Sequence, residues 1–347
     1  MQAGKLHLGP SDNAATAFPV TEQPWKLVAD VGGTNARFGL AREVDGSAAV
    51  EEIHTLRCAD FESLEQAARA YLESIPAAMA AAVGEACIAV AGPIDGDRVA
   101  VTNLPWRFSG TGLASALGYS RVALLNDFAA LAMACPGLDG THLERIDNLT
   151  GPLPEHEPVR AVVGPGTGLG VCGLQRTATG WEPRPGEGGH ASIAPATDEE
   201  FAIIRYLHRE FEHVSAEHLL SGPGLENIYR SLVALRDVQA PQRTAADIST
   251  AALVGDCQLA GDAVETFCGL LGSFCGDVAL VMGARGGLYL GGGIPPKIRP
   301  LLVRSDFERR LRAKGPMSAY LENLPVYLVS HPFPALHGAA DYLGGQK

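Results

Sequence analysis

Short apolar runs that end at glycine-rich turns recur along this chain, and they predict a protein of alternating strands and helices. The first run, residues 27–29, precedes a turn, and two further extended segments follow at 38–41 and 50–56. Short apolar runs bounded by Gly, Pro, Asn or Asp are typical of buried β-strands. The same pattern predicts strands at 86–90, 98–102, 121–125, 161–163, 171–174, 287–290 and 326–329.

Amphipathic and small-residue segments predict the helices. Residues 61–75 form the first of them, and Asp60 precedes it as the expected N-cap. The longest is expected at about 262–283. Others are expected at 113–117, 127–134, 198–213, 216–220, 223–235, 244–254 and 335–343. The proline-bearing stretch 136–160 carries no predicted element.

The chain repeats its opening pattern. Strand, glycine–threonine turn and strand recur at 161–174, so that Thr34 and Thr167 lie 133 positions apart. Two related α/β halves with a nucleotide cleft between them explain this repeat best. We therefore expect an N-terminal tail at 1–24, a small α/β domain at 25–136 completed by a C-terminal helix at 331–347, and a large α/β domain at 137–330.

Composition narrows the class of protein. The 347 residues are 46% hydrophobic and 19% charged, which is typical of a soluble protein with room for two cores. A net charge of −12 without any basic cluster argues against a general nucleic-acid binder. No signal peptide is recognised in residues 1–24, and no run of about 18 apolar residues predicts a membrane span. The seven cysteines contain no C-x-x-C pair, which favours reduced thiols in the cytoplasm.

Two turns carry the candidate chemistry. The first reads Asp30-Val31-Gly32-Gly33-Thr34-Asn35, and the second reads Gly164-Pro165-Gly166-Thr167-Gly168. A tight glycine turn between strands directs backbone N–H groups and a Thr hydroxyl toward one point, where a phosphate can bind. A strand follows each turn, whereas Walker and dinucleotide loops lead into a helix. The pair therefore predicts a nucleotide held from both sides of a cleft.

Asp30 stands at a strand end beside the first phosphate turn. A carboxylate in this place suits Mg²⁺, which it holds directly or through water. The alternative is that Asp30 only caps the turn. We favour the metal role because the second loop predicts a nucleotide nearby.

Five blocks in order resemble the bacterial glucokinase family. They are residues 27–37, Asn126-Asp127-Phe128, 164–170, 185–190 and 217–224, and the resemblance runs from about Trp25 to the C-terminus. It implies the two-domain actin-like ATPase (ribonuclease H-like) fold, with a cleft between a small and a large domain. It also implies ATP-dependent phosphorylation of glucose at the 6-hydroxyl, the first step of glycolysis, with Mg²⁺ accompanying ATP.

The resemblance implies a role for each matched residue, with Asp127 as the catalytic base. The implied sugar-binding residues are Asn103, Asn126, Asp127, Glu187, His190 and Glu217. The implied ATP-binding residues are Asp30, Gly32, Gly33, Thr34, Asn35, Gly166, Thr167, Gly168, Gly291 and Gly292. The first set suits a polyol, because carboxylates accept hydrogen bonds from hydroxyls while Asn and His donate and accept.

One departure separates the chain from the related ROK proteins. Those carry a zinc-binding C-x-C-G-x-x-G-x-C cluster after a similar loop, but residues 191–256 here contain no cysteine. No zinc is therefore expected, and the non-ROK group fits better.

Other readings stay open from the residues alone. A kinase for fructose, mannose, glucosamine or an acylated amino sugar is the nearest. A sugar-sensing regulator would need a DNA-reading domain, for which about 24 residues before the first strand are few. A phosphatase or acyl-phosphate kinase fits the Asn126-Asp127 block poorly.

We expect glucose and ATP as partners, no nucleic acid or membrane, and a homodimer as the commonest assembly. The phosphoryl donor could also be ADP or polyphosphate.

Overall fold

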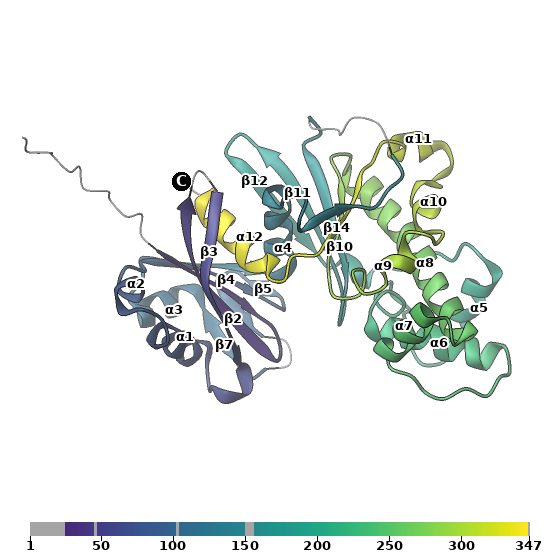
Figure 1. Ribbon diagram of the computed structural model, residues 1–347, viewed down its shortest axis with the longest axis horizontal. Coiled ribbons are helices and arrows are strands. Elements are labelled where there is room, and N and C mark those ends of the chain that lie inside the picture. The colour runs from purple at the N-terminus through teal and green to yellow at the C-terminus, as the bar shows by residue number, and fades with distance from the viewer. Residues whose placement is uncertain (1–24, 45–46, 102–103, 150–155, 346–347) are drawn as a thin grey trace, which may run out of the picture.

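The computed structural model describes residues 25–44, 47–101, 104–149 and 156–345. The predicted tail at 1–24 and the predicted sugar ligand Asn103 lie outside these residues. Within them, two large sheets stand on either side of a pair of helices, and further helices cover each outer face (Figure 1). Three apolar clusters occupy the spaces between these layers.

The first sheet has the strand order β3-β2-β1-β4-β8. Its strands are β1 (Lys26–Val31), β2 (Asn35–Val44), β3 (Ser47–Arg57), β4 (Glu85–Val90) and β8 (Arg121–Asn126). Strand β1 runs antiparallel to β2 and parallel to β4, and β4 runs parallel to β8. The outer helices are α1 (Leu64–Glu73), α2 (Ala77–Ala81) and α3 (Gly110–Leu117). A small sheet of β5 (Ile94–Asp95), β6 (Arg98–Ala100) and β7 (Arg107–Ser109) adjoins them.

The second sheet repeats the first. Its strands, in spatial order, are β12 (Gly180–Gly186), β11 (Leu169–Thr177), β10 (Val159–Pro165), β13 (Leu288–Leu290), β14 (Val326–Val329) and β9 (Leu143–Arg145). Strand β10 is antiparallel to β11 and parallel to β13, as β1 is to β2 and β4. The repeat predicted from the two glycine–threonine turns is therefore confirmed. Strand β9, which the sequence did not predict, adds an antiparallel edge beside β14.

Helices cover the outer face of the second sheet. They are α5 (Asp198–Leu207), α6 (Gly222–Leu235), α7 (Ala245–Val254), α8 (Gln258–Met282), α9 (Arg299–Leu302), α10 (Phe307–Arg312) and α11 (Ser318–Leu321). Helix α8 packs against α6, α7, α10 and β10. It is long and apolar enough to cross a membrane, but 67% of its most apolar window is buried inside the protein, as in a core helix.

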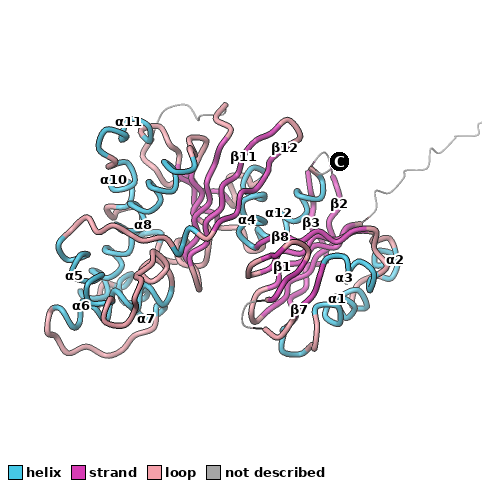
Figure 2. The backbone as a smooth tube through the Cα atoms, turned by 180° about the vertical axis from the view of Figure 1, so that it is seen from behind, coloured by secondary structure: helices cyan, strands magenta, loops and turns pink. Residues whose placement is uncertain are grey.

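Two helices lie between the sheets, as both views show (Figures 1 and 2). Helix α12 (Pro334–Gly344) packs on the first sheet, while α4 (Asp127–Ala134) packs against β10, β11 and β12 of the second. The two helices touch closely, because a Cβ added to Gly338 of α12 would lie 1.7 Å from the backbone oxygen of Ala130. One apolar cluster consequently contains residues of both sheets, such as Val28 and Val162.

Three local expectations were wrong. Ser63, not Asp60, caps α1, since its Oγ accepts a hydrogen bond from the amide of Gln66, whereas Asp60 lies in the 3₁₀ turn Cys58–Asp60. Residues 216–220 form turns rather than a helix, because their first amides bond to residues 189–191. The helix predicted at 198–213 ends at Leu207.

Candidate active site

The first glycine turn is a tight hairpin between β1 and β2. The amide of Gly32 donates to the carbonyl of Asn35 across 3.0 Å, and the carbonyl of Thr34 accepts from the amide of Cys58 at 2.9 Å. Thr34 at its tip is exposed. These hydrogen bonds close the turn but leave Thr34 at its tip accessible to a ligand.

Asp30 lies at the base of this turn and pairs with Arg37, with 3.0 Å between Oδ2 and Nη1. Burial raises the pKa of Asp30 above its usual range, and the positive charge of Arg37 opposes this shift only in part. The other carboxylate oxygen accepts no hydrogen bond from any described residue. The Asp30 side chain is 21% exposed, so solvent reaches part of it.

The second turn lies against a third glycine loop, residues 291–293, which follows β13. The amide of Gly166 donates to the carbonyl of Gly168 at 2.8 Å, while the carbonyl of Gly166 accepts from Gly222, the first residue of α6, at 2.8 Å. Gly292 has φ of 78°. A Cβ there would lie 2.3 Å from the carbonyl oxygen of Pro165. Glycine is required at this position because the two loops are stacked backbone to backbone.

The start of α4 carries two predicted sugar-binding residues. The side chain of Asn126 caps the helix, since its Oδ1 accepts from the amides of Phe128 at 2.9 Å and Ala129 at 3.3 Å. The Oδ1 of Asp127 also accepts from the Phe128 amide, at 2.9 Å. These hydrogen bonds fix the N-terminus of α4 and with it the position of the Asp127 carboxylate.

Asp127 has a strongly shifted ionisation. Burial raises its pKa to about 6, and the negative charges of Asp30 and Glu187 add to the shift while the Phe128 amide opposes it. These charges act on Asp127 from the first turn and from the segment after β12. A carboxylate with a pKa close to neutrality is suited to accept a proton from a substrate.

Glu187, His190 and Glu217 lie on two paired segments. The amide of Glu217 donates to the carbonyl of Gly189 at 2.8 Å, so that the segment 187–190 lies alongside the turn at 216–220. Glu187 and His190 are 76% and 63% exposed, and Oε2 of the first lies 4.0 Å from Nε2 of the second. The Oε2 atom of Glu217 accepts from the amide of Leu169 at 2.8 Å, directly after the second turn.

A cavity of about 530 Å³ opens between the two sheets. Asn126 lines it from the first sheet and Glu187 from the end of β12. This volume lies within the range of small-molecule binding sites. Of the predicted sugar-binding residues, the structure thus brings Asn126 and Glu187 to one cavity, and electrostatic coupling and backbone pairing link Asp127, His190 and Glu217 to the same region.

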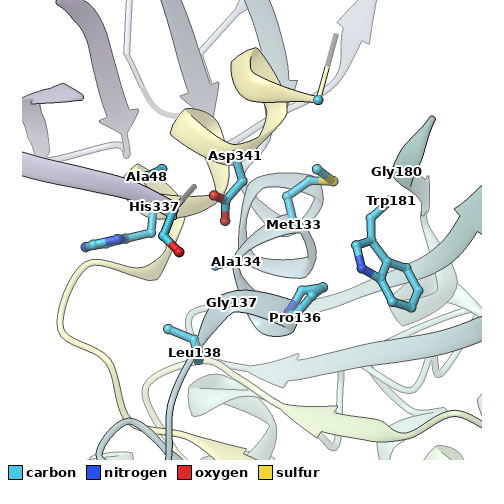
Figure 3. Close-up of a pocket in the computed structure, with 12 residues that line it drawn as sticks. Ala48, Met133, Ala134, Pro136, Gly137, Leu138, Gly180, Trp181, His337 and Asp341 are labelled. Atoms are coloured by element: carbon cyan, nitrogen blue, oxygen red, sulfur yellow. The ribbon is translucent and has the colours of Figure 1, made fainter. Parts of the chain in front are cut away.

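A second cavity, of about 340 Å³, lies elsewhere around α4 (Figure 3). Met133, Pro136, Trp181 and Asp341 line it, and none of the predicted site residues does. Sequence reasoning also assigned no separate role to Phe128, although its ring fills the space beside two glycines of the second sheet. The signal was present in the sequence, as an aromatic residue directly after Asn126-Asp127 and two glycines flanking the second turn.

The repeated sheets, the cleft and the stacked glycine loops define an actin-like ATPase fold, as the sequence resemblance predicted. A sequence model of the family described as Glucokinase matches residues 27–346. The chain therefore belongs to the glucokinase family, and that resemblance is confirmed.

Individual proteins show the same relationship. The glucokinase of Chromobacterium violaceum is 44% identical over 318 residues, which cover 92% of this chain and 89% of that protein. A bifunctional protein glk of Burkholderia lata is 43% identical over 346 residues, and the chain spans 52% of its length. The crystal structure of a glucokinase from an Antarctic psychrotroph is 40% identical, with a TM-score of 0.84, and the match covers 93% of this chain and all of that one.

Proposed function

We propose that this protein is a glucokinase that transfers the terminal phosphoryl group of ATP to the 6-hydroxyl of glucose. Family membership supports the enzyme class. The observation that carries the assignment of the site is the position of Asp127. Its carboxylate, with a pKa of about 6, is coupled to Asp30 of the first phosphate turn and to Glu187 of the cavity.

The sugar is proposed to bind at the cavity between the sheets. Glu187 and His190 present exposed polar atoms, and Asn126 lines the opposite wall. Carboxylates accept from hydroxyls while Asn and His donate and accept. A site that pairs each hydroxyl discriminates against isomers, because a misplaced hydroxyl leaves a buried polar group unpaired. Glu217 and Asn103, by their resemblance to the family pattern, complete the proposed set.

The nucleotide is proposed to bind along the three glycine loops. On one side is the first turn, in which the amide of Gly32 closes the turn and Gly33, Thr34 and Asn35 would face the phosphates with backbone amides and a hydroxyl. On the other side is the second turn, in which the amide of Gly166 closes the turn and Thr167 and Gly168 would supply the donors; the N-terminus of α6 abuts this turn and favours negative charge. Gly291 and Gly292 would admit the adenosine close to the backbone.

The donor set at Asp30 fits Mg²⁺ bound mainly through phosphates. No group of three or more His, Cys, Asp or Glu side chains with metal-ligand geometry occurs within the described part of the chain. The unpaired oxygen of Asp30 offers one carboxylate ligand, directly or through water, and Mg²⁺ commonly takes one or two carboxylates besides phosphates. When bound, the ion would neutralise charge on the phosphates.

Asp127 would act on the attacking hydroxyl. As the 6-oxygen of glucose forms its bond to the terminal phosphorus, the bond from that phosphorus to the bridging oxygen of ADP breaks, and the hydroxyl proton passes to Asp127. The transition state of phosphoryl transfer is loose, so the carboxylate also orients the nucleophile. Such a base contributes roughly 10²–10⁴-fold.

A coupled assay with glucose, ATP and Mg²⁺ tests the proposal directly. Wild-type protein should form glucose 6-phosphate, and Asp127→Asn should lower kcat by roughly 10²-fold or more while glucose binding is retained. Faster turnover of fructose, mannose, glucosamine or an acylated amino sugar would reassign the substrate. Glucose binding without turnover by the wild-type protein would favour a sugar sensor. An Asp127→Asn variant with a rate near that of wild type would show that Asp127 is not the catalytic base.

The setting of the enzyme is also proposed. It would supply glucose 6-phosphate to glycolysis in the cytoplasm, as a homodimer. Light scattering after gel filtration checks the assembly, since a monomeric mass at micromolar concentration would contradict it.

A further inference from the structure

The ring of Phe128 lies against a pair of glycines on the second sheet. A Cβ added to Gly164 would lie 2.5 Å from the ring, and one added to Gly170 would lie 2.0 Å from it. These two glycines face each other across β10 and β11. The ring therefore rests on bare backbone of both strands, immediately before they separate into the second phosphate turn.

A second contact fixes the same face of α4. Leu131 follows Phe128 by three residues and so lies on the same side of the helix. A Cβ on Gly291, in the third glycine loop, would lie 2.5 Å from Leu131 Cδ2. Helix α4 thus packs through two side chains onto glycines at the second and third glycine loops, both of which are proposed to bind the nucleotide. A side chain at any of these glycines would clash with Phe128 or Leu131, so that either that side chain or α4 itself must shift.

The backbone of Phe128 holds the neighbouring carboxylate. Its amide donates to Oδ1 of both Asn126 and Asp127, at 2.9 Å each. The ring and the amide of this one residue thus connect the Asp127 carboxylate to the strands that carry the second turn. Strand β8 of the first sheet ends at Asn126 and so holds the other side of the Asp127 carboxylate.

We propose that Phe128 is a positioning residue, which sets the Asp127 carboxylate relative to the phosphate held by the second turn. This rests on the proposed function. A displacement of about 1 Å between reacting groups can cost roughly 10²-fold in rate. The glycine pair is then part of the catalytic geometry, since it allows the ring to approach the backbone of the turn.

Complementary changes of size test the contact. Gly170→Ala places a methyl group where the ring lies, and should lower kcat about tenfold or more, with dissociation constants for glucose and ATP within about threefold of wild type. Phe128→Leu should also lower kcat. The double variant should exceed Gly170→Ala in kcat by about tenfold, because the smaller side chain makes room for the methyl group. The melting temperature that Gly170→Ala lowers should recover in the double variant for the same reason.

Two controls separate positioning from packing. Phe267→Leu changes a fully buried phenylalanine in α8 and should lower the melting temperature while kcat stays within about twofold. Gly261→Ala, on a helix face with open space, should leave kcat unchanged and raise the melting temperature slightly, because alanine favours a helix more than glycine does. If Gly170→Ala does not fold, Gly164→Ala replaces it in the same cycle.

The outcomes are distinct. A double variant whose losses in kcat simply add would overturn the positioning role, and so would a Phe128→Leu enzyme with wild-type kcat. Loss of glucose and ATP binding in proportion to kcat would do the same, because it indicates general damage. A wild-type protein that does not phosphorylate glucose would overturn the proposed function together with this one.

Discussion

The carboxylate of Glu217 accepts a hydrogen bond from the backbone amide of Leu169, with 2.8 Å between Oε2 and N. The same oxygen would lie 2.5 Å from a Cβ on Gly168, so the side chain lies directly on the second turn. The backbone amide of Glu217 bonds to Gly189 in the proposed sugar-binding segment. One residue therefore connects the segment proposed for glucose to the loop proposed for phosphate.

This connection predicts different effects for two substitutions of Glu217. Glu217→Gln retains an oxygen that can accept from Leu169, so KM for ATP should stay within about threefold while KM for glucose rises. Glu217→Ala leaves a buried amide without its partner, at a cost of about 1–3 kcal/mol, so both KM values should rise about tenfold. Steady-state kinetics with each substrate varied in turn measures this. Identical ATP kinetics for the two variants would show that the Leu169 contact does not shape the loop.

Substitution of Glu187 should weaken the binding of glucose but not that of ATP. Its side chain is 76% exposed and makes no hydrogen bond to any of the three glycine loops within the described residues. Glu187→Ala should raise the glucose dissociation constant about tenfold and that of ATP less than about twofold. Glu73→Ala, on the exposed end of α1, is the control. Equal weakening of both ligands would point to general damage instead.

The pH dependence of the rate should follow Asp127. Its pKa of about 6 means that the carboxylate is ionised, and able to accept a proton, only above that pH. The value of kcat/KM for glucose should be flat above pH 7 and fall about tenfold per unit well below 6. In Asp127→Asn this acid limb should be absent from the residual rate. A limb that persists unchanged in the variant would belong to another group.

Asp341 should destabilise the fold at neutral pH. Burial raises its pKa to about 6, and its carboxylate, which lines the second cavity, has no hydrogen-bond or ion-pair partner among the described residues (Figure 3). The unfolded chain releases this proton near 3.8, so the free energy of unfolding falls as pH rises from about 4 to about 6. Asp341→Asn should be more stable than wild type by about 1–3 kcal/mol at pH 8, with a smaller gain at pH 5. Urea unfolding at the two pH values measures this difference. A gain in stability that does not depend on pH would show that the raised pKa of Asp341 is not its cause.

A buried ion pair in the helical layer should be costly to break. Arg310 and Glu200 are 7% and 4% exposed, and Arg310 Nη2 lies 3.0 Å from Glu200 Oε2. Arg310→Ala leaves the carboxylate buried without its partner, and should lower the free energy of unfolding by about 3–5 kcal/mol. Arg309→Ala breaks an exposed pair with Asp306 and should cost less than about 1 kcal/mol. Similar losses for the two variants, measured by urea unfolding, would contradict this ranking.

Local pattern alone predicted most of the strands and the repeat of the sheets. A strand such as β1 or β10 is encoded within a few apolar residues and the turn that ends them, so no distant contact is needed to recognise it. Helix ends and isolated turns were harder. Ser63 and not Asp60 caps α1 because the chain extends once more at Phe61, and residues 216–220 do not form a helix because they pair with a segment about 26 positions earlier.

The sequence by itself determined the paired glycine turns, because these depend on residue types at short spacing, and its resemblance to the glucokinase family implied the fold and the candidate residues. Only the tertiary structure decided which side chains come together: Phe128 lies on the glycine pair, Glu217 accepts from the amide of Leu169, and the charges of Asp30 and Glu187 act on Asp127. It also decided the raised pKa of Asp127. Burial and the distance between charges set that value, and both depend on segments that are distant in the chain and that only packing brings together.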